Sequence, residues 1–137
     1  MASTLNPYIS YPGSARQALE FYRGVFGGDL RLNTFGEAGG FGAQDADKIM
    51  HGMLETPSGF TIMGADTPTG MERTVGTNMA VSLSGDGADE LRGYFAKLSE
   101  GGTVTMPLEK QMWGDEFGMC VDPFEVQWMV NMTQPSS

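Results

Sequence analysis

The sequence predicts an α+β fold built from two tandem β-α-β-β-β modules. The first observation behind this prediction is an internal repeat, because residues 78–102 repeat residues 6–28 and the identical residues are all displaced by the same interval. The second is that each copy passes from the alternation of a strand to the spacing of an amphipathic helix and ends at a glycine pair. A repeated strand-helix unit indicates an internal duplication. The identical pairs that fix its register are Asn6 and Asn78, Ser10 and Ser82, Gly13 and Gly85, Leu19 and Leu91, and Tyr22 and Tyr94.

Length and composition are those of one domain. The chain has 137 residues, of which 40% are hydrophobic, so it can bury a core. No apolar run reaches the length of a transmembrane helix. We expect a single domain over residues 1–137, with the first module at residues 4–66 and the second at residues 77–132.

The charge pattern disfavours two classes of partner. The net charge is -9, from 17 Asp and Glu against 8 Lys and Arg, and the basic residues are scattered singly. We therefore expect neither nucleic acid nor a membrane as a partner. The first residues lack the basic and apolar parts of a signal peptide, and the single Cys120 excludes an internal disulfide. Both observations favour a cytoplasmic location.

The first module begins with a strand expected over residues 5–11, where apolar and small polar residues precede a Pro-Gly pair. A helix over residues 15–26 follows, because its apolar residues fall on one face and a glycine pair ends it. Ser14 and Gln17 have the spacing of a capping box, so we expect Ser14 to cap this helix. Three further strands are expected at residues 29–35, 48–56 and 60–65.

The second module repeats this order after a linker rich in Pro and Gly. Its helix is expected over residues 88–99, with Asp86 as the N-cap. Its strands are expected at residues 78–84, 103–113, 116–121 and 125–132.

Several segments carry a family resemblance. They are NPYISY at residues 6–11, ALEFYRGVFGG at 18–28, the strand with His51, the Asp66 that ends the fourth strand, GGTVTMPLEKQMWGDEFG at 101–118 and DPFEVQWMVN at 122–131. Together they resemble the glyoxalase, bleomycin-resistance and extradiol dioxygenase superfamily, also called the vicinal oxygen chelate proteins, and most closely its PhnB-like branch. The resemblance covers nearly the whole chain. It implies that the two modules form a curved eight-stranded cup around a cleft and that the protein forms a homodimer.

The chain departs from the pattern of this superfamily at two places. Relatives in the branch usually have Gly where this chain has Glu125, so we expect that turn to differ. In metal-dependent relatives the ligands are His, Glu or Gln on the first and last strands of each module. The corresponding residues here are Asn6, Asn78 and Met129, with Thr61 or Met63 as the fourth. Divalent Fe, Mn, Zn or Ni needs imidazole or carboxylate, so we expect no metal and no cofactor.

His51 is the only histidine and the candidate catalytic residue. Strand alternation places it on one face with Met53 and Glu55. There it could hydrogen-bond a ligand or act as a general base, or it could be satisfied by a neighbouring strand or a dimer contact. A nucleophilic pair of Cys120 with His51 is a further alternative, although a thiol inside a strand is typical of an inert buried cysteine.

Methionine and aromatic side chains gather on the expected strands. They suit either a pocket for an apolar or aromatic small molecule or an ordinary core. We expect the ligand to contact Asn6, His51, Met63, Asn78, Trp113, Phe117 and Met129 in the cleft between the modules. The leading hypothesis is metal-independent binding of such a molecule.

Other functions stay open on the sequence. One is an enzyme of the same superfamily, either a metal-dependent lyase, isomerase or dioxygenase or an acid-base catalyst centred on His51. Another is an interaction module whose exposed strand edges bind a protein. A ubiquinone-pathway methyltransferase, an activity that an old family label attaches to such sequences, is rejected because no Gly-rich nucleotide-binding turn is present.

Overall fold

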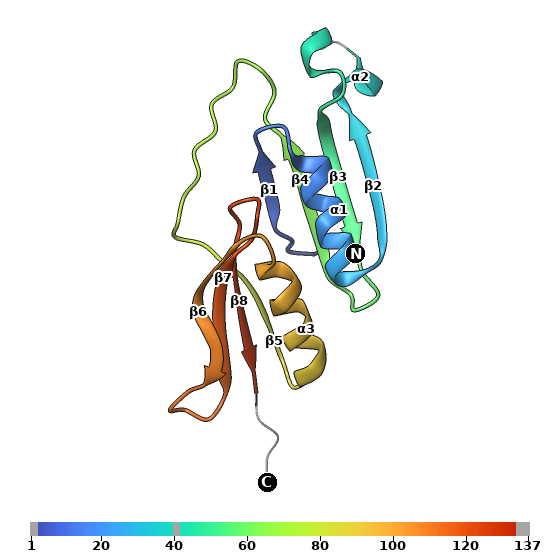
Figure 1. Cartoon of the computed structure of the whole chain (residues 1–137). Coiled ribbons are helices and arrows are strands. Elements are labelled where there is room, and N and C mark those ends of the chain that lie inside the picture. The colour runs from blue at the N-terminus through green and yellow to red at the C-terminus, as the bar shows by residue number, and fades with distance from the viewer. Residues whose placement is uncertain (1–2, 40–41, 134–137) are drawn as a thin grey trace. The chain divides into compact units, whose positions relative to one another are not determined.

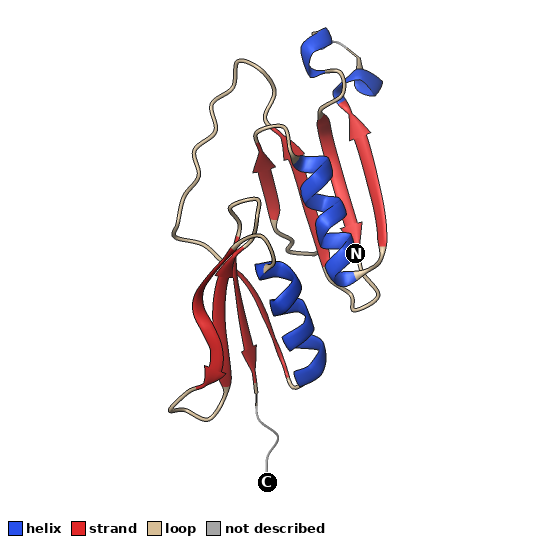
Figure 2. Ribbon diagram, viewed as in Figure 1, coloured by secondary structure: helices blue, strands red, loops and turns tan. Residues whose placement is uncertain are grey.

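The computed structural model describes residues 3–39 and 42–133. The chain divides into two compact units, Met1–Thr74 and Val75–Ser137. In each unit a helix packs against one face of a four-stranded sheet (Figures 1 and 2). The predicted α+β fold of two β-α-β-β-β modules is therefore confirmed.

The first unit holds a mixed sheet with strand order β1-β4-β3-β2. Strand β1 runs parallel to β4, and the other neighbours are antiparallel. A short helix and a 3-10 turn between β2 and β3 were not expected. The elements are β1 Tyr8–Tyr11, α1 Ala15–Phe26, β2 Asp29–Thr34, α2 Phe35–Ala38, the 3-10 turn Ala43–Asp45, β3 Ile49–Glu55 and β4 Thr61–Asp66.

The second unit repeats this topology with strand order β5-β8-β7-β6. Here β5 runs parallel to β8, and the remaining pairs are antiparallel. The elements are β5 Val81–Gly85, α3 Ala88–Ser99, β6 Thr103–Lys110, β7 Glu116–Val121 and β8 Gln127–Met132. Identical strand order and identical strand directions in both units support the duplication seen in the sequence.

The core of the first unit lies between α1 and its sheet. The apolar stripe of α1 is buried as predicted, and burial of a side chain such as Leu19 contributes about 1.5–3 kcal/mol. Two glycines leave room for core side chains, because Gly52 on β3 pairs with Gly64 on β4 and neither has a Cβ atom. A Cβ atom at Gly52 would collide with the Leu19 side chain, and one at Gly64 would lie 3.0 Å from the ring of Tyr11. The buried stripe of α1 is Ala15, Ala18, Leu19, Tyr22, Val25 and Phe26.

The core of the second unit lies between α3 and β5, β7 and β8. Of the predicted stripe of α3, Leu91, Phe95 and Leu98 are buried, whereas Ala88 is half-buried. They pack with the buried sheet residues Leu83, Cys120, Trp128, Val130 and Met132. The buried Asp122 accepts a hydrogen bond from the Trp128 Nε1 atom at 2.9 Å.

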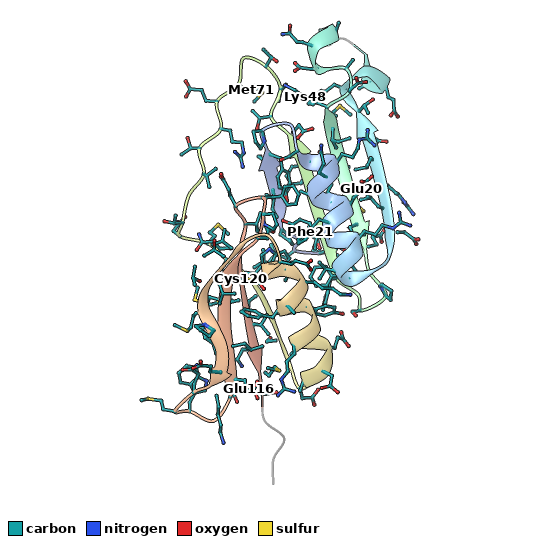
Figure 3. All side chains as sticks on the ribbon, in the orientation of Figure 1. Glu20, Phe21, Lys48, Met71, Glu116 and Cys120 are labelled. Carbon is teal, nitrogen blue, oxygen red and sulfur yellow. The ribbon has the colours of Figure 1, made fainter. Side chains whose placement is uncertain are left out.

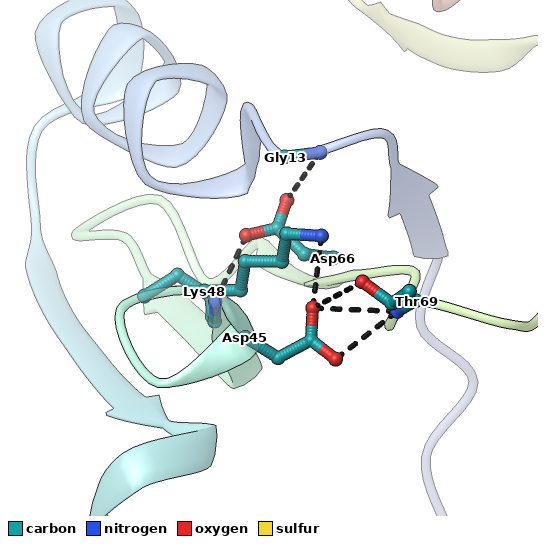
Figure 4. A network of polar contacts seen from close by, with 6 residues as sticks. Gly13, Asp45, Lys48, Asp66 and Thr69 are labelled. Carbon is teal, nitrogen blue, oxygen red and sulfur yellow. Dashed lines mark hydrogen bonds and ion pairs between the residues drawn. The ribbon is translucent and has the colours of Figure 1, made fainter. Parts of the chain in front are cut away.

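The start of α1 is stabilised by a residue that the sequence analysis did not assign to it. The predicted capping box of Ser14 and Gln17 is wrong, because the Ser14 side chain makes no capping hydrogen bond. Instead, the Oδ1 atom of Asp66 accepts hydrogen bonds from the backbone amides of Gly13, at 3.0 Å, and Ala15, at 2.8 Å. Figure 4 shows this carboxylate among its partners.

Two further helix starts differ from the prediction. Asp86 is not the N-cap of α3, because Gly87 occupies that position and no side chain caps the helix. A capping box does form at α2, where the Thr34 Oγ1 atom accepts from the Glu37 amide at 3.1 Å. The Thr34 amide in turn donates to the Glu37 carboxylate at 3.4 Å.

A second buried carboxylate holds the segment that follows β4. Asp45, which is 5% exposed, accepts hydrogen bonds from the Thr69 amide and hydroxyl and pairs with the Lys48 ammonium at 3.0 Å (Figure 4). The hydrogen bond from Lys48 and those from Thr69 lower the pKa of Asp45. Further along, the Arg73 Nε atom donates to the Ser10 carbonyl on β1 at 2.8 Å.

Candidate functional site

Each sheet has one face that the helix of its own unit does not cover, here called the open face. In the first unit, residues alternate along β3 and β4 between buried positions under α1 and partly exposed positions. Gly52 and Leu54 lie under the helix, so His51 and Met53, which were predicted to share a face, lie on the open face. The first open face consists of Tyr8, Ser10, Asp29, Arg31, Asn33, His51, Met53, Glu55, Thr61, Met63 and Ala65.

An aromatic pair occupies the middle of the first open face. The rings of Tyr8 and His51 stack with their centroids 5.8 Å apart and their planes at 28°. The two residues come from strands β1 and β3, which flank β4, so their rings meet across β4. Ala65 lies on the same face of β4, and its small side chain leaves room for this contact. Tyr8 remains 53% exposed, so the pair is not sealed in the core.

The second open face is built in the same way. Trp128 and Val130 of β8 are buried under α3, so Met129 and Asn131 lie on the opposite face. The second open face consists of Ser82, Ser84, Thr103, Met106, Glu109, Phe117, Met119, Val121, Gln127, Met129 and Asn131.

One end of the second open face is aromatic and polar. Trp113, in the turn between β6 and β7, makes an edge contact with Phe117 at a centroid separation of 6.2 Å. The Asn131 Nδ2 atom donates to the Asp115 carboxylate at 3.1 Å, which fixes the amide beside this pair. Trp113 is 60% exposed.

The structure places the predicted site residues in three groups. His51 and Met63 lie on the first open face, and Phe117 and Met129 lie on the second, with Trp113 against Phe117. The two asparagines lie outside the strands in which they were expected. Asn6 precedes β1 and donates from Nδ2 to the Thr4 Oγ1 atom at 3.3 Å, and Asn78 is exposed before β5.

Sequence reasoning missed Tyr8 and did not single out Met119 among the methionines of the expected strands. The signal for both was present, because strand alternation places Tyr8 with Asn6 and Ser10, and Met119 with Phe117. Two other methionines lie apart from the open faces or in a turn: Met132 is buried in the core, and Met112 is 98% exposed.

The residues that correspond to the family's divalent-metal ligands do not fit such a metal. Asn6 and Asn78 supply neutral amides, and Met63 and Met129 supply soft thioethers, whereas Fe, Mn, Zn and Ni need imidazole or carboxylate. Among residues 3–39 and 42–133, no group of three or more His, Cys, Asp or Glu side chains could hold a metal ion. The chemistry of these donors therefore gives no reason to route a reaction step through a divalent metal.

Cys120 does not fit the role of a nucleophile. It lies on the helix side of β7 (Figure 3) and is 1% exposed. Burial, and to a smaller extent the nearby Asp122 carboxylate, raises the pKa of the Cys120 thiol to about 11. The thiol is therefore protonated near neutral pH and is not the reactive thiolate that such catalysis needs.

Comparison with known proteins identifies the family. Residues 4–130 match the model of the Glyoxalase/Bleomycin resistance protein/Dioxygenase superfamily. The chain belongs to this superfamily. Membership confirms the resemblance seen in the sequence and agrees with the paired β-α-β-β-β units.

Particular members of the glyoxalase superfamily resemble the chain along most of its length. Protein YjdN of Escherichia coli K12 is 27% identical over 142 residues, which cover 95% of each chain. The crystal structure of protein PA1353 from Pseudomonas aeruginosa is 35% identical, with a TM-score of 0.87 over 98% of this chain and 100% of that one.

A further structural neighbour has the same fold. The PhnB protein from Bacillus cereus has a TM-score of 0.76 at 21% identity, over 96% of this chain and 100% of that one. Its name also carries a methyltransferase label, but identity at this level shows the fold alone. No helix in the described part of the chain is long and apolar enough to cross a membrane.

Proposed function

We propose that this glyoxalase-superfamily protein binds a small apolar or aromatic molecule on its open faces without a divalent metal. One observation carries the proposal: aromatic and thioether side chains occupy sheet faces that the helices leave uncovered. Tyr8 is 53% exposed and Met106 is 41% exposed, so these side chains are not ordinary core. The cleft between the modules that the resemblance implies stays a prediction.

The expected affinity is low. Apolar surface removed from water contributes about 25 cal/mol per Å², so a ligand that covers about 300 Å² gains about 7.5 kcal/mol. Association itself costs at least about 4 kcal/mol. The net free energy of binding is therefore at most about 3.5 kcal/mol, which corresponds to a dissociation constant of a few millimolar or weaker and sets the concentrations for a screen. Ser10, Asn33, Gln127 and Asn131 on the open faces supply directional hydrogen-bonding groups.

The proposal is tested with an apolar aromatic dye, anilinonaphthalene sulfonate, titrated by fluorescence. We expect saturable binding to the native protein and weaker binding to His51→Ala and Trp113→Ala. Met71→Ala is the control, because Met71 is 68% exposed after β4 and lies on neither open face. Unchanged binding in both open-face variants, or equal loss in the control, would contradict the proposed location. A thermal-shift screen of aromatic and dicarbonyl compounds then defines the ligand class.

A second candidate function is acid-base catalysis at His51. The observation that favours it is the contact of His51 with Tyr8, since both side chains can carry a transferable proton. Turnover of a dicarbonyl compound by metal-stripped protein that is abolished in His51→Gln would support this function. A requirement for stoichiometric Fe, Mn, Zn or Ni would instead contradict both the acid-base and the binding proposals.

We further propose that the protein is a cytoplasmic homodimer. The support is the family resemblance together with the acidic composition and the single cysteine. Light scattering after size exclusion would show twice the mass of the 14.7 kDa chain, and a monomer at micromolar concentration would contradict the dimer.

A further inference from the structure

Three methionines lie in one row across the second open face. Met106 on β6 is the register partner of Met119 on β7, and Met119 is the partner of Met129 on β8. Met119 and Met129 are half-buried, and Met106 is 41% exposed. Ser82 on β5 ends the row as the partner of Met129.

The geometry of a sheet brings these thioethers within reach of one point. Directly opposed residues on neighbouring strands have Cβ atoms about 4.5–5.5 Å apart. Methionine has three flexible side-chain torsions, so the sulfur atoms of the outer two can lean toward Met119. The pairing of β6 with β7 is irregular on both sides of Met106. Such bulges re-aim a side chain relative to a regular strand.

We propose that Met106, Met119 and Met129 form a binding site for a soft monovalent cation, with Cu(I) as the ion and Ag(I) as its analogue. Thioether sulfur is neutral and polarizable, and it selects Cu(I) over hard divalent ions. The phenyl ring of Phe117, two residues before Met119 on the same face, adds a polarizable wall. The net charge of -9 raises the local concentration of cations.

This site differs from the divalent centre that the family resemblance suggests. Of the residues that correspond to the family's divalent-metal ligands, the proposed Cu(I) site includes only Met129. Its other ligands come from β6 and β7. It also departs from the sequence expectation of no metal, which considered divalent ions. The Cu(I) site can be tested separately from the proposed small-molecule binding. A Met→Leu substitution removes the sulfur ligand but keeps the apolar surface.

The test is an anaerobic Cu(I) titration of the whole protein in competition with bathocuproine disulfonate. We expect one Cu(I) per chain and an affinity that falls about tenfold or more in Met119→Leu. Met132→Leu and Met112→Leu are matched controls, since one residue is buried under α3 and the other is 98% exposed in a turn. Both should bind Cu(I) as the native protein does.

A second readout follows the methionine methyl signals by NMR during addition of Ag(I). We expect the signals of Met106, Met119 and Met129 to move together, while those of Met112 and Met132 stay in place. Undiminished Cu(I) binding in Met119→Leu, equal loss in Met112→Leu, or absence of stoichiometric binding would overturn the inference. Binding of anilinonaphthalene sulfonate to Met119→Leu is measured as well. It distinguishes a failure of the Cu(I) site from a failure of the proposed small-molecule binding.

Discussion

The rings of Tyr8 and His51 stack across β4, with centroids 5.8 Å apart, although the residues lie on strands β1 and β3. His51 is the only histidine in the sequence, so the NMR signals of its ring report on this contact. In Tyr8→Leu we expect the His51 ring proton signals to move downfield, because the ring current of the neighbouring tyrosine is lost. NMR of the histidine ring checks this. Tyr94→Leu, on α3 of the other unit, is the control and should leave the signals unchanged.

Asp66 joins β4 to the starts of α1 and β3. Its carboxylate is 4% exposed and accepts from the amides of Gly13, Ala15 and Ile49. In Asp66→Asn the side-chain NH2 group replaces one of the accepting oxygens and faces the backbone N–H groups. We therefore expect the free energy of unfolding to fall by about 2–3 kcal/mol. Urea unfolding measures the loss. Asp86→Asn is the exposed control and should change stability by less than about 0.5 kcal/mol.

Acid should release the segment that Asp45 holds. The Lys48 and Thr69 hydrogen bonds hold the pKa of Asp45 below its ordinary value of 3.8. A lowered pKa in the folded state means that the stabilisation is present above the unfolded pKa and is lost as pH falls through the folded value. The Thr69 amide signal should therefore titrate with a midpoint below 3.8. A midpoint at or above 3.8 would contradict the hydrogen bonds of Asp45 with Lys48 and Thr69. An unchanged titration of the Thr69 amide in Asp45→Asn would contradict them as well.

Glu125 is strained in the turn before β8. Its φ is 70°, so the turn keeps a backbone conformation that favours glycine, contrary to the expected difference. Glu125→Gly should raise the free energy of unfolding by about 0.5–1 kcal/mol, because relief of strain exceeds the added entropy of the unfolded chain. Glu125→Ala removes the charge but keeps Cβ, and it should give no gain. Equal gains in both variants would assign the effect to charge.

The sequence predicted the elements well because local patterns determine them. Apolar spacing located both helices at their observed bounds, Ala15–Phe26 and Ala88–Ser99, and alternation correctly put His51 and Met53 on the same face of their strand. Strand ends were less accurate. The strands expected to begin at residues 5 and 78 begin at Tyr8 and Val81, which leaves Asn6 and Asn78 outside them.

Long-range contacts explain what the sequence could not show. Ser14 has the local signal of a cap, but Asp66, distant in sequence, supplies the oxygen because the parallel pairing of β1 with β4 brings it to the helix start. The contact of Tyr8 with His51 likewise depends on strand order. Local sequence patterns therefore predict the helices, the strands and which residues share a face. Contacts between residues distant in sequence depend on the order of the strands in the sheet.

The most direct test of binding on the open faces is NMR of the methionine methyl groups during titration with anilinonaphthalene sulfonate. We expect the signals of Met53 and Met63 on the first open face, and those of Met119 and Met129 on the second, to shift and to saturate. Met71, which is 68% exposed after β4 and lies on neither open face, should not respond. A shift confined to Met71, or no saturable shift at the open-face methionines, would contradict binding on the open faces.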